Sequence, residues 1–387
     1  MLRRYRLKDL NFLLIFLLIG ISVVGLLLVG SADDSLVSKQ FLGLVAGVVL
    51  MLFIAFVDYS WVLYFYWLIY FVNLALLGAV IIMGIASHGA ARWISIGGDN
   101  GLIFQPTELS KILLILFFAM YFSKHENDLN TFRTILKTAV LMAVPIIMVA
   151  RQPDLKNAIT ITIVLCILMY IAGLSYKVIG KILLIVIPAF ILVFVLITQT
   201  DLPILQDYQK ERIMTFMDPS NEEYTESANQ QNSSVTAIGS GQLHGKGLNN
   251  NEVTSSNKGN FVAETQNDFI FAVAGEELGF VGCAAIIAVL FLIVLLCIRT
   301  GNRAKDLSGK IICCGMASLV AIQSFINICV ATGLLPNTGT PLPFISYGLT
   351  SLMSLFIGMG FVLNVGLQKS IYNKAPELKK LDKRVLG

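Results

Sequence analysis

Long runs of apolar residues recur along the whole 387-residue chain, and each run is bounded by charged or turn-forming residues. A helix needs about 18 to 20 consecutive apolar residues to cross the hydrocarbon core of a bilayer. The pattern predicts ten membrane-spanning helices, near residues 11–30, 41–57, 61–85, 106–122, 138–150, 158–173, 182–198, 269–298, 311–333 and 349–367. The shortest run, 138–150, contains Pro145, and it requires snorkelling of Lys137 or a locally thinner bilayer to reach across.

The connections between these runs complete the predicted fold, an all-α polytopic membrane protein with a single integral membrane domain over residues 1–387. Residues 199–268, between spans seven and eight, form the one long polar segment, and such a loop is usually functional or disordered. Within it, residues 210–219 carry apolar side chains at helical spacing beside basic ones, which predicts a short interfacial helix. Residues 334–348 contain three prolines and no charge. Irregular backbone at membrane depth must be buried in protein or line a cavity, so we predict a re-entrant segment there.

Composition supports membrane residence and gives an orientation. The chain is 56% hydrophobic and only 13% charged, with a mean hydropathy of +0.78, whereas soluble domains carry about 25% charged residues. A cytosolic enzyme, a disordered chain and a nucleic-acid module are thereby excluded. If the N-terminus lies inside, most of the 28 basic residues fall in cytoplasmic segments, as the positive-inside rule requires. We predict that both termini are cytoplasmic, and the net charge of +4 does not indicate a nucleic-acid partner.

Several apparent motifs carry little weight. The six cysteines lie inside predicted spans and the three histidines are scattered over different loops, so neither a disulfide framework, a zinc site nor a catalytic triad is indicated. Residues 239–247 superficially resemble a phosphate-binding loop, but the glycine spacing is one residue short and Gly247 replaces the metal-binding hydroxyl. We interpret that segment as a glycine-rich turn.

Ionisable side chains near spans are more informative, because each costs roughly 2.5–3.5 kcal/mol at the centre of a membrane helix. Pro106 suits a first helical turn, and Glu108 and Lys111 follow it three residues apart on one helix face. Their spacing fits either a neutralised ion pair at a helix end or the polar wall of a cavity. Arg151 and Asp154 flank the end of the fifth span, and we predict an interfacial cap where the two charges meet.

Carboxylates also cluster at the start of the eighth span. Glu264 and Asp268 lie one turn apart if this stretch is already helical. Close carboxylates raise one another's pKa, as a proton-transfer site needs. The alternative is a neutralised helix cap in which the helix dipole favours Asp268. Glu276 and Glu277, just inside the span, are predicted to be a buried hydrogen-bonded pair that fixes helix contacts beside small residues.

These segments together resemble the SEDS family (shape, elongation, division and sporulation), which includes RodA, FtsW and SpoVE, and RodA is the member most resembled. Over nearly the whole chain, the family's motifs occur in order as Ala91-Arg-Trp-Ile94, Phe104-Gln-Pro-Thr-Glu-Leu-Ser-Lys111, Arg151-Gln-Pro-Asp154, Arg212-Ile-Met-Thr-Phe-Met-Asp-Pro219, Ala237-Ile-Gly-Ser-Gly241, Asp268-Phe-Ile-Phe-Ala-Val-Ala-Gly-Glu-Glu-Leu-Gly279 and Pro341-Leu-Pro-Phe-Ile-Ser-Tyr-Gly348. The resemblance implies a bacterial plasma-membrane peptidoglycan glycosyltransferase that polymerises lipid II at the outer face for cell elongation and shape. It also implies a class B penicillin-binding protein, a transpeptidase, as partner within the elongation or division machinery.

The acidic residue proposed to be catalytic in the family lies in a Leu-Pro-Glu-x-x-Thr-Asp-Phe pattern, which reads Val262-Ala-Glu-Thr-Gln-Asn-Asp-Phe269 here. Both carboxylates are kept, while Pro and Thr are replaced. Elsewhere Lys156-Asn157 stands where Gly-Thr is usual, and Leu349 stands where a second glycine usually follows Ser-Tyr-Gly.

The resemblance implies a role for each matched residue. Asp268 would act as general base on the acceptor hydroxyl, with Glu264 orienting or tuning it. The other substrate-binding candidates are Lys111 and Arg212 for the leaving diphosphate, Trp93 for stacking on sugar, and Glu108, Asp154, Ser346 and Tyr347. Carboxylates and a diphosphate could hold a divalent cation, magnesium or manganese. Two other functions fit the same sequence, namely a lipid II flippase and a scaffold that only recruits the transpeptidase.

Overall fold

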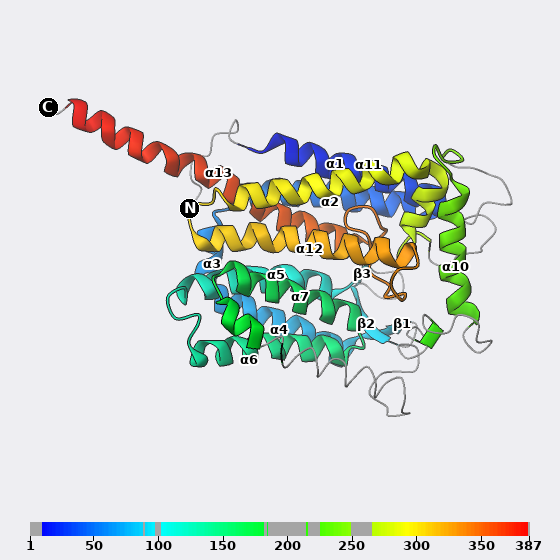
Figure 1. The fold of residues 1–387 in the computed structure, drawn as a ribbon, viewed down its shortest axis with the longest axis horizontal. Helices are drawn as coiled ribbons and strands as arrows, with labels where there is room; N and C mark the ends of the chain where they lie inside the picture. The colour runs from blue at the N-terminus through cyan, green and yellow to red at the C-terminus, as the bar shows by residue number, and fades with distance from the viewer. Residues whose placement is uncertain are drawn as a thin grey trace.

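The computed structural model describes residues 10–87, 90–96, 102–181, 184, 214–215, 225–248 and 265–385. Its main elements are α1 (Phe12–Ala32), η2 (Asp34–Leu36), α2 (Val37–Ala55), α3 (Tyr59–Tyr64), α4 (Tyr66–Met83), β1 (Ile85–Ser87), β2 (Ala90–Ile96), β3 (Leu102–Phe104), α5 (Pro106–Lys124), α6 (Phe132–Arg151), α7 (Leu155–Ile171), α10 (Thr225–Ser240), α11 (Ile270–Gly301), α12 (Leu307–Ala331) and α13 (Leu349–Val385). The long helices run side by side (Figure 1). We call the end with the strands and α10 the sheet end, and the end where α13 projects the tail end.

The described helices confirm a mostly helical, multi-pass membrane protein. Eight of them are long and apolar enough to cross a bilayer, and α7 is a shorter apolar helix. These nine correspond to nine of the ten predicted spans. The tenth, 182–198, lies outside the described residues except for residue 184, and the predicted helix 210–219 does so except for residues 214–215; these three residues are helical.

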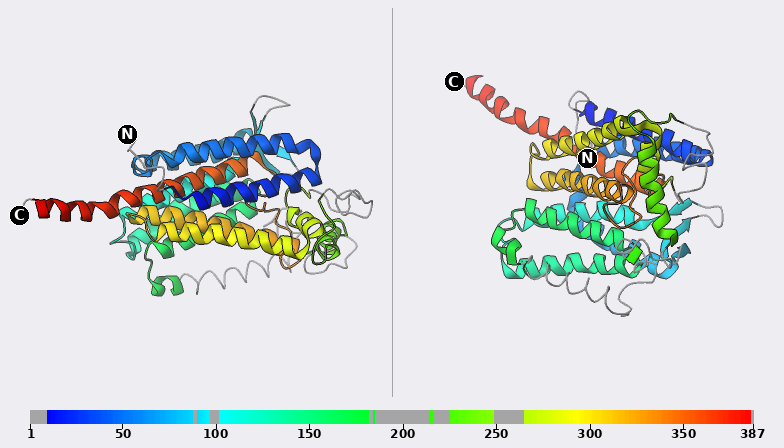
Figure 2. Two further views of the ribbon diagram at one scale, coloured as in Figure 1. Left: turned by 90° about the horizontal axis from the view of Figure 1, so that it is seen from above. Right: turned by 45° about the vertical axis from the view of Figure 1, so that its right-hand side comes forward.

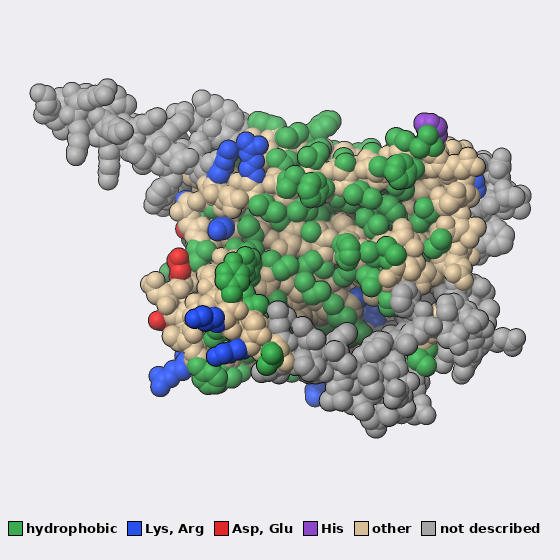
Figure 3. Space-filling view, in the orientation of Figure 1, with side chains coloured by type: hydrophobic (Ala, Val, Ile, Leu, Met, Phe, Trp, Pro, Cys, Tyr) green, Lys and Arg blue, Asp and Glu red, His purple; other side chains and the backbone are tan. Residues whose placement is uncertain are grey.

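The bundle has a buried centre and an apolar outer layer. The buried share of the most apolar window is 78% in α5, 67% in α12 and 72% in α13, but only 22–39% in α1, α2, α4, α6 and α11. The two views of Figure 2 show α13 passing between the other helices before it projects at the tail end. Hydrophobic side chains cover the face in Figure 3, and its Lys and Arg side chains gather mostly towards the tail end. This is the surface expected of a protein that presents its sides to lipid.

The sixth helix corrects the prediction of a short span over 138–150. α6 begins at Phe132, where the Thr131 side chain accepts a hydrogen bond from the Thr134 N–H, so it is long enough to cross without a thinned bilayer. Pro145 lies inside it and has no N–H to donate to the carbonyl of Leu141. The Tyr70 hydroxyl of α4 donates to that carbonyl at 3.0 Å. A neighbouring helix thereby satisfies the backbone group that the proline leaves free.

Three short strands between α4 and α5, namely β1, β2 and β3, add to the predicted all-α fold. They form a three-stranded antiparallel sheet in the order β1-β2-β3, with Ile85 opposite Trp93 and Ile94 opposite Phe104. Strands of three to seven residues are too short for a clear alternating pattern. The predicted span 61–85 is also divided, since α3 and α4 are separated at Phe65.

The segment between α12 and α13, residues 332–348, has no helix or strand; its first part is partly exposed, whereas residues 339–346 are mostly buried. Phe344 and Ile345 are buried. A Cβ atom on Gly25 of α1 would lie 2.6 Å from the Ile345 Cα, so only glycine allows this approach. Burial in protein is the condition under which irregular backbone can enter a membrane, and the re-entrant course stays a prediction.

Candidate active site at the sheet end

A buried ion pair lies at the sheet end of α5. Pro106 occupies the first helical turn, and one turn later the Lys111 Nζ lies 2.8 Å from the Glu108 Oε1, with both residues 3% exposed. Lys111 also donates to the Asn157 Oδ1 of α7 at 3.1 Å. The pairing predicted from spacing is therefore present, and it links two helices.

Asp154 extends this pair into a network and corrects the prediction of an interfacial cap. Arg151 is exposed, whereas Asp154 is fully buried. Its Oδ2 accepts from Asn157 at 2.8 Å and, at 3.3 Å each, from Gln105 and Thr107. The partners of this carboxylate come from the start of α5 rather than from the neighbouring arginine. A continuous polar chain therefore runs from Glu108 through Lys111 and Asn157 to Asp154.

A side chain of the small sheet contacts the backbone next to this network. The Arg92 guanidinium of β2 donates to the carbonyl of Pro153, next to Asp154. Trp93, the residue predicted to stack on sugar, is the next residue on β2 and is partly buried. The structure thus brings its strand beside the network.

Asp268 lies in a turn, residues 265–269, directly before α11, and is partly buried. α11 begins only at Ile270, so the helical start that would place Asp268 and Glu264 on one face is not formed over residues 265–269. Glu264 and Arg212 lie outside the described residues. Their roles stay predictions.

Ser346 and Tyr347 reach the Asp268 turn rather than an open surface. The Ser346 hydroxyl donates to the Asn267 carbonyl at 2.6 Å, and the Tyr347 N–H donates to the Gln266 carbonyl at 2.9 Å. Burial, and next the nearby charge of Asp33, raise the pKa of the Tyr347 phenol. That hydroxyl therefore stays protonated at neutral pH and can donate a hydrogen bond.

Segment 332–348 joins the network to the Asp268 turn. From α7, the Lys156 Nζ donates to the Gly339 carbonyl. From α12, the Asn327 Nδ2 donates to both the Thr340 carbonyl at 2.7 Å and the Asp268 carbonyl at 2.8 Å. The buried cation and the candidate base therefore belong to one connected framework.

The glycine-rich turn beyond α10 lies against α11. Gly245 has φ +77°, and its Cβ, if present, would lie 2.1 Å from the Glu277 carbonyl oxygen. The Lys246 side chain pairs with Glu276 at 2.8 Å, and the Ser31 hydroxyl donates to Glu277. The glycines thus serve close packing rather than phosphate binding, and each glutamate bonds a different segment of the chain, Glu276 the turn after α10 and Glu277 the end of α1.

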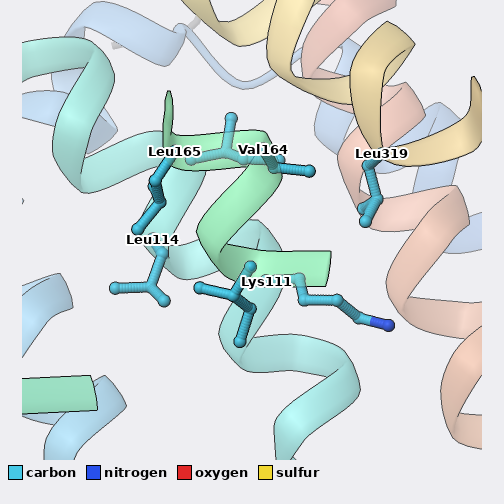
Figure 4. Close-up of a pocket in the computed structure, with 7 residues that line it drawn as sticks. Lys111, Leu114, Val164, Leu165 and Leu319 are labelled. Carbon is cyan, nitrogen blue, oxygen red and sulfur yellow. The ribbon is translucent and has the colours of Figure 1, made fainter. Parts of the chain in front are cut away.

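A small cavity beside Lys111 shows how tightly the pair is enclosed. Its volume is about 10 Å³, and it is lined by Lys111 with apolar residues of α5, α7 and α12. In Figure 4 the ammonium of Lys111 points away from Leu114 and Leu165. A space of about one water with an apolar wall holds water poorly. The space beside the ion pair is therefore small and mostly apolar.

Sequence reasoning missed Lys156, Asn157 and Asn327. In the sequence the first two stand out only as departures from the family pattern, although Asn157 follows Asp154 by one helical turn. Asn327 lies within an apolar run, where a neutral amide attracts less attention than a charge. All three hold the site together.

Within the described residues, no group of three or more His, Cys, Asp and Glu side chains is placed to hold a metal ion. A dedicated magnesium or manganese site usually draws on several oxygen ligands. A cation could here be shared by at most two of these carboxylates and by oxygens of a bound substrate.

Comparison with known proteins gives consistent relatives. The model of the FtsW, RodA and SpoVE family, described as a cell cycle protein family, matches residues 6–371. A probable peptidoglycan glycosyltransferase FtsW of Geobacter sulfurreducens is 36% identical over 76% of this chain and 74% of its own length. The peptidoglycan glycosyltransferase MrdB of Escherichia coli K12 is 30% identical over 94% of this chain and 95% of its own.

Two solved structures have the same fold. One, from a study of how a peptidoglycan synthase complex coordinates polymerization and crosslinking, superposes with a TM-score of 0.76 at 25% identity, covering 93% of this chain and 98% of the other. The crystal structure of the rod shape determining protein RodA of Thermus thermophilus gives a TM-score of 0.68 at 24% identity, covering 93% and 97%.

Proposed function

The chain belongs to the FtsW, RodA and SpoVE family and is a peptidoglycan glycosyltransferase, and we propose that it polymerises lipid II with Asp268 as general base. Asp268 accepts the proton of the GlcNAc 4-hydroxyl of an incoming lipid II. The hydroxyl oxygen forms a bond to C1 of the lipid-linked glycan chain as the bond from C1 to the diphosphate oxygen breaks. C1 is inverted, and undecaprenyl diphosphate leaves with the electron pair.

The observation that carries this proposal is the link between the buried Lys111 ammonium and the Asp268 turn, which runs through α7, segment 332–348 and α12. A leaving diphosphate develops negative charge, which a fixed cation in a site of low dielectric stabilises. Among the described contacts, Lys111 uses two of its three N–H donors, on Glu108 and Asn157. The third is available for a phosphate oxygen. Glu108 orients the ammonium when no substrate is bound.

The remaining predicted roles follow from the family resemblance. We assign Glu264 to tuning of Asp268, Arg212 to the diphosphate and Trp93 to a sugar face. Asp154 acts through Asn157 on Lys111. A divalent cation, magnesium or manganese, would enter with the substrate diphosphate and neutralise part of its charge.

The setting of the reaction is also part of the proposal. The sheet end lies at the outer face of the bacterial plasma membrane and both termini are cytoplasmic, because the predicted cytoplasmic segments hold most of the basic residues. The fold shared with a protein of a peptidoglycan synthase complex supports a crosslinking partner, a class B penicillin-binding protein. From the RodA-like motif pattern of the sequence we propose a role in elongation.

The flippase alternative is not favoured, because the named relatives are glycosyltransferases. A scaffold without activity would leave the buried ion pair and the Asp268 turn without a use.

The test is polymerisation of purified lipid II by the protein with its partner, read as glycan length on gels. We expect Asp268→Asn to lose at least about 100-fold in rate, the usual contribution of a general base, while its expression and folding stay normal. Asp34→Asn, an exposed carboxylate at the same end, is the matched control and should keep full activity. Full activity of Asp268→Asn would disprove the assignment. Movement of lipid II across vesicles without glycan formation would revive the flippase.

A further inference from the structure

Three consecutive backbone carbonyls before α11 each accept a hydrogen bond from elsewhere in the fold. The Gln266 carbonyl accepts from the Tyr347 N–H at 2.9 Å, and the Asn267 carbonyl accepts from the Ser346 hydroxyl at 2.6 Å. The Asp268 carbonyl accepts from the Asn327 side chain at 2.8 Å. We call residues 266–268 with these three donors the carbonyl clamp. Its donors come from two separate elements, so the turn is held from two directions.

This turn lacks the usual local support of a helix start. Phe269, the N-cap residue of α11, makes no side-chain capping bond, whereas Ser, Thr, Asp or Asn commonly supplies one. The carbonyl clamp supplies support from outside the turn for the conformation of residues 266–268. Because the carbonyl and the carboxylate of Asp268 share one Cα, fixing the carbonyl restricts where the carboxylate can point.

Asn327 is the donor of the carbonyl clamp that lies on a helix. It lies in the last two turns of α12 and is 1% exposed. Its amide nitrogen also donates to the Thr340 carbonyl at 2.7 Å, so both N–H groups are used. Its Oδ1 is buried with no hydrogen-bond partner among the described residues. The two donated bonds alone therefore fix the orientation of the amide.

The end of α12 is itself held in place. From α10, Gln231 donates to the carbonyls of Val330 and Leu335 at 3.0 and 2.7 Å, and Ser234 donates to the Ala331 carbonyl at 2.8 Å. These bonds tie the C-terminal end of α12 and the start of segment 332–348 to α10. A side chain one turn before this anchored end is a firmer support for a reacting group than a loop residue.

We propose that Asn327 is a positioning residue for the glycosyl transfer: its amide holds the Asp268 backbone so that the carboxylate faces the acceptor hydroxyl. This inference rests on the proposed role of Asp268 as general base. Asn327 does not contact substrate. Removing it leaves the base present but misdirected, and a misplacement of about 1 Å can cost about 100-fold in rate.

The experiment measures lipid II polymerisation by the full chain with its partner, per folded molecule, across pH. Asn327→Leu keeps the approximate volume and removes both donors. We expect kcat to fall about 10- to 100-fold with KM for lipid II unchanged, and the acidic limb of the kcat profile to move because the carboxylate sits in a changed environment. Asn327→Gln, which keeps the amide donors, should recover part of kcat.

Gln323 provides a matched control. It lies one turn away on α12, is also 1% exposed, and neither of its amide atoms has a hydrogen-bond partner among the described residues. Gln323→Leu should leave kcat, KM and the pH profile at their wild-type values. If Asn327→Leu does not fold, Ser346→Ala removes another bond of the carbonyl clamp and should lower kcat, without raising KM, by a smaller factor.

The outcomes separate this inference from the proposed function. An active Asp268→Asn variant refutes the general base itself. The positioning role alone is refuted if Asp268→Asn is inactive while Asn327→Leu keeps the wild-type kcat and pH profile. If Asn327→Leu does not fold, the same conclusion follows from a wild-type kcat and pH profile of Ser346→Ala. A fall in total activity that disappears when the rate is expressed per folded molecule, with an unmoved acidic limb, shows a structural role. That result also overturns the positioning role.

Discussion

Polar side chains connect the helices at both ends of the bundle, but they do so in different ways. At the tail end, Asn364 of α13 donates to the Ala55 carbonyl at 2.8 Å and accepts from the Tyr59 N–H at 2.9 Å. The Tyr59 hydroxyl donates to Asp306 at 2.7 Å, and Asp306 in turn caps the Gly309 N–H at 2.8 Å. Most of these bonds close helix ends, where backbone groups lack partners.

At the tail end, Asp58 is a fixed charge of a structural kind. Partial burial tends to raise the pKa of Asp58, but hydrogen bonds from Gln368 and Ser60 and the charge of Lys305 outweigh it, and the pKa is lowered. A carboxylate with a lowered pKa stays ionised at neutral pH and does not transfer protons.

At the sheet end the bonds of the network run mainly between side chains and leave capacity unused. Glu108, Lys111, Asn157 and Asp154 contact one another, and the buried Oδ1 of Asp154 has no hydrogen-bond partner among the described residues. An unpartnered buried oxygen costs roughly 1–3 kcal/mol. The difference teaches that buried polarity alone does not mark an active site. We take the unused donor and acceptor capacity of the charged network as the feature that distinguishes the candidate active site.

The strongest test of the comparison is Lys111→Met at the sheet end. It leaves Glu108 buried without its cation, which costs about 3–5 kcal/mol, and it removes the charge proposed to face the diphosphate. We expect at least about 100-fold lower polymerisation rate and a lower thermal midpoint in detergent.

A double variant separates these two effects. Adding Glu108→Gln removes the unpaired charge, so the thermal midpoint should recover while the polymerisation rate stays low. Recovery of the rate along with the midpoint would mean that the sheet-end network is structural, like that of the tail end.

Tyr59→Phe probes the tail end with a smaller expected effect. The variant loses one hydrogen bond to a carboxylate, which is worth about 1.5–3 kcal/mol, so we expect a lower unfolding midpoint. The polymerisation rate per folded molecule should stay within about twofold of wild type. A large loss of rate in well-folded protein would show that the tail end also takes part in the reaction.

The two ends were not equally predictable from sequence. The spans could be located because hydrophobicity is read over a local window, and the Glu108–Lys111 pair because its members are three residues apart. Asp154 was misjudged because Arg151, in the same short Arg-Gln-Pro-Asp motif, was expected to meet its charge, whereas its partners Gln105 and Thr107 lie 49 and 47 residues away. Contacts over such distances depend on helix packing, which no local pattern encodes.

The neutral residues of the site were missed for a different reason. A search for residues that are energetically unfavourable in a membrane finds charged side chains, because burying a charge in lipid costs much more free energy than burying a neutral amide. Asn157 and Asn327 became visible only when their partners were known. The Asp268 turn was recognised by resemblance, while the bonds that hold it come from residues 59 to 81 positions further along the chain.

Tyr70→Phe gives the smallest expected effect and tests whether activity tolerates a purely structural loss between the two ends. The Leu141 carbonyl, freed by Pro145, would lose its donor, and side-chain hydrogen bonds inside membranes are worth about 0.6–1.7 kcal/mol. We expect a small fall in the unfolding midpoint and an unchanged rate per folded molecule. Pro145→Ala restores an N–H to α6, so in that background Tyr70→Phe should cost less, because the carbonyl then has a partner within its own helix. A cost unchanged by Pro145→Ala would show that Tyr70 stabilises α6 by packing rather than by this bond. A fall in rate for well-folded Tyr70→Phe would mean that activity follows any loss of stability, and the contrast between the two ends would no longer identify the active site.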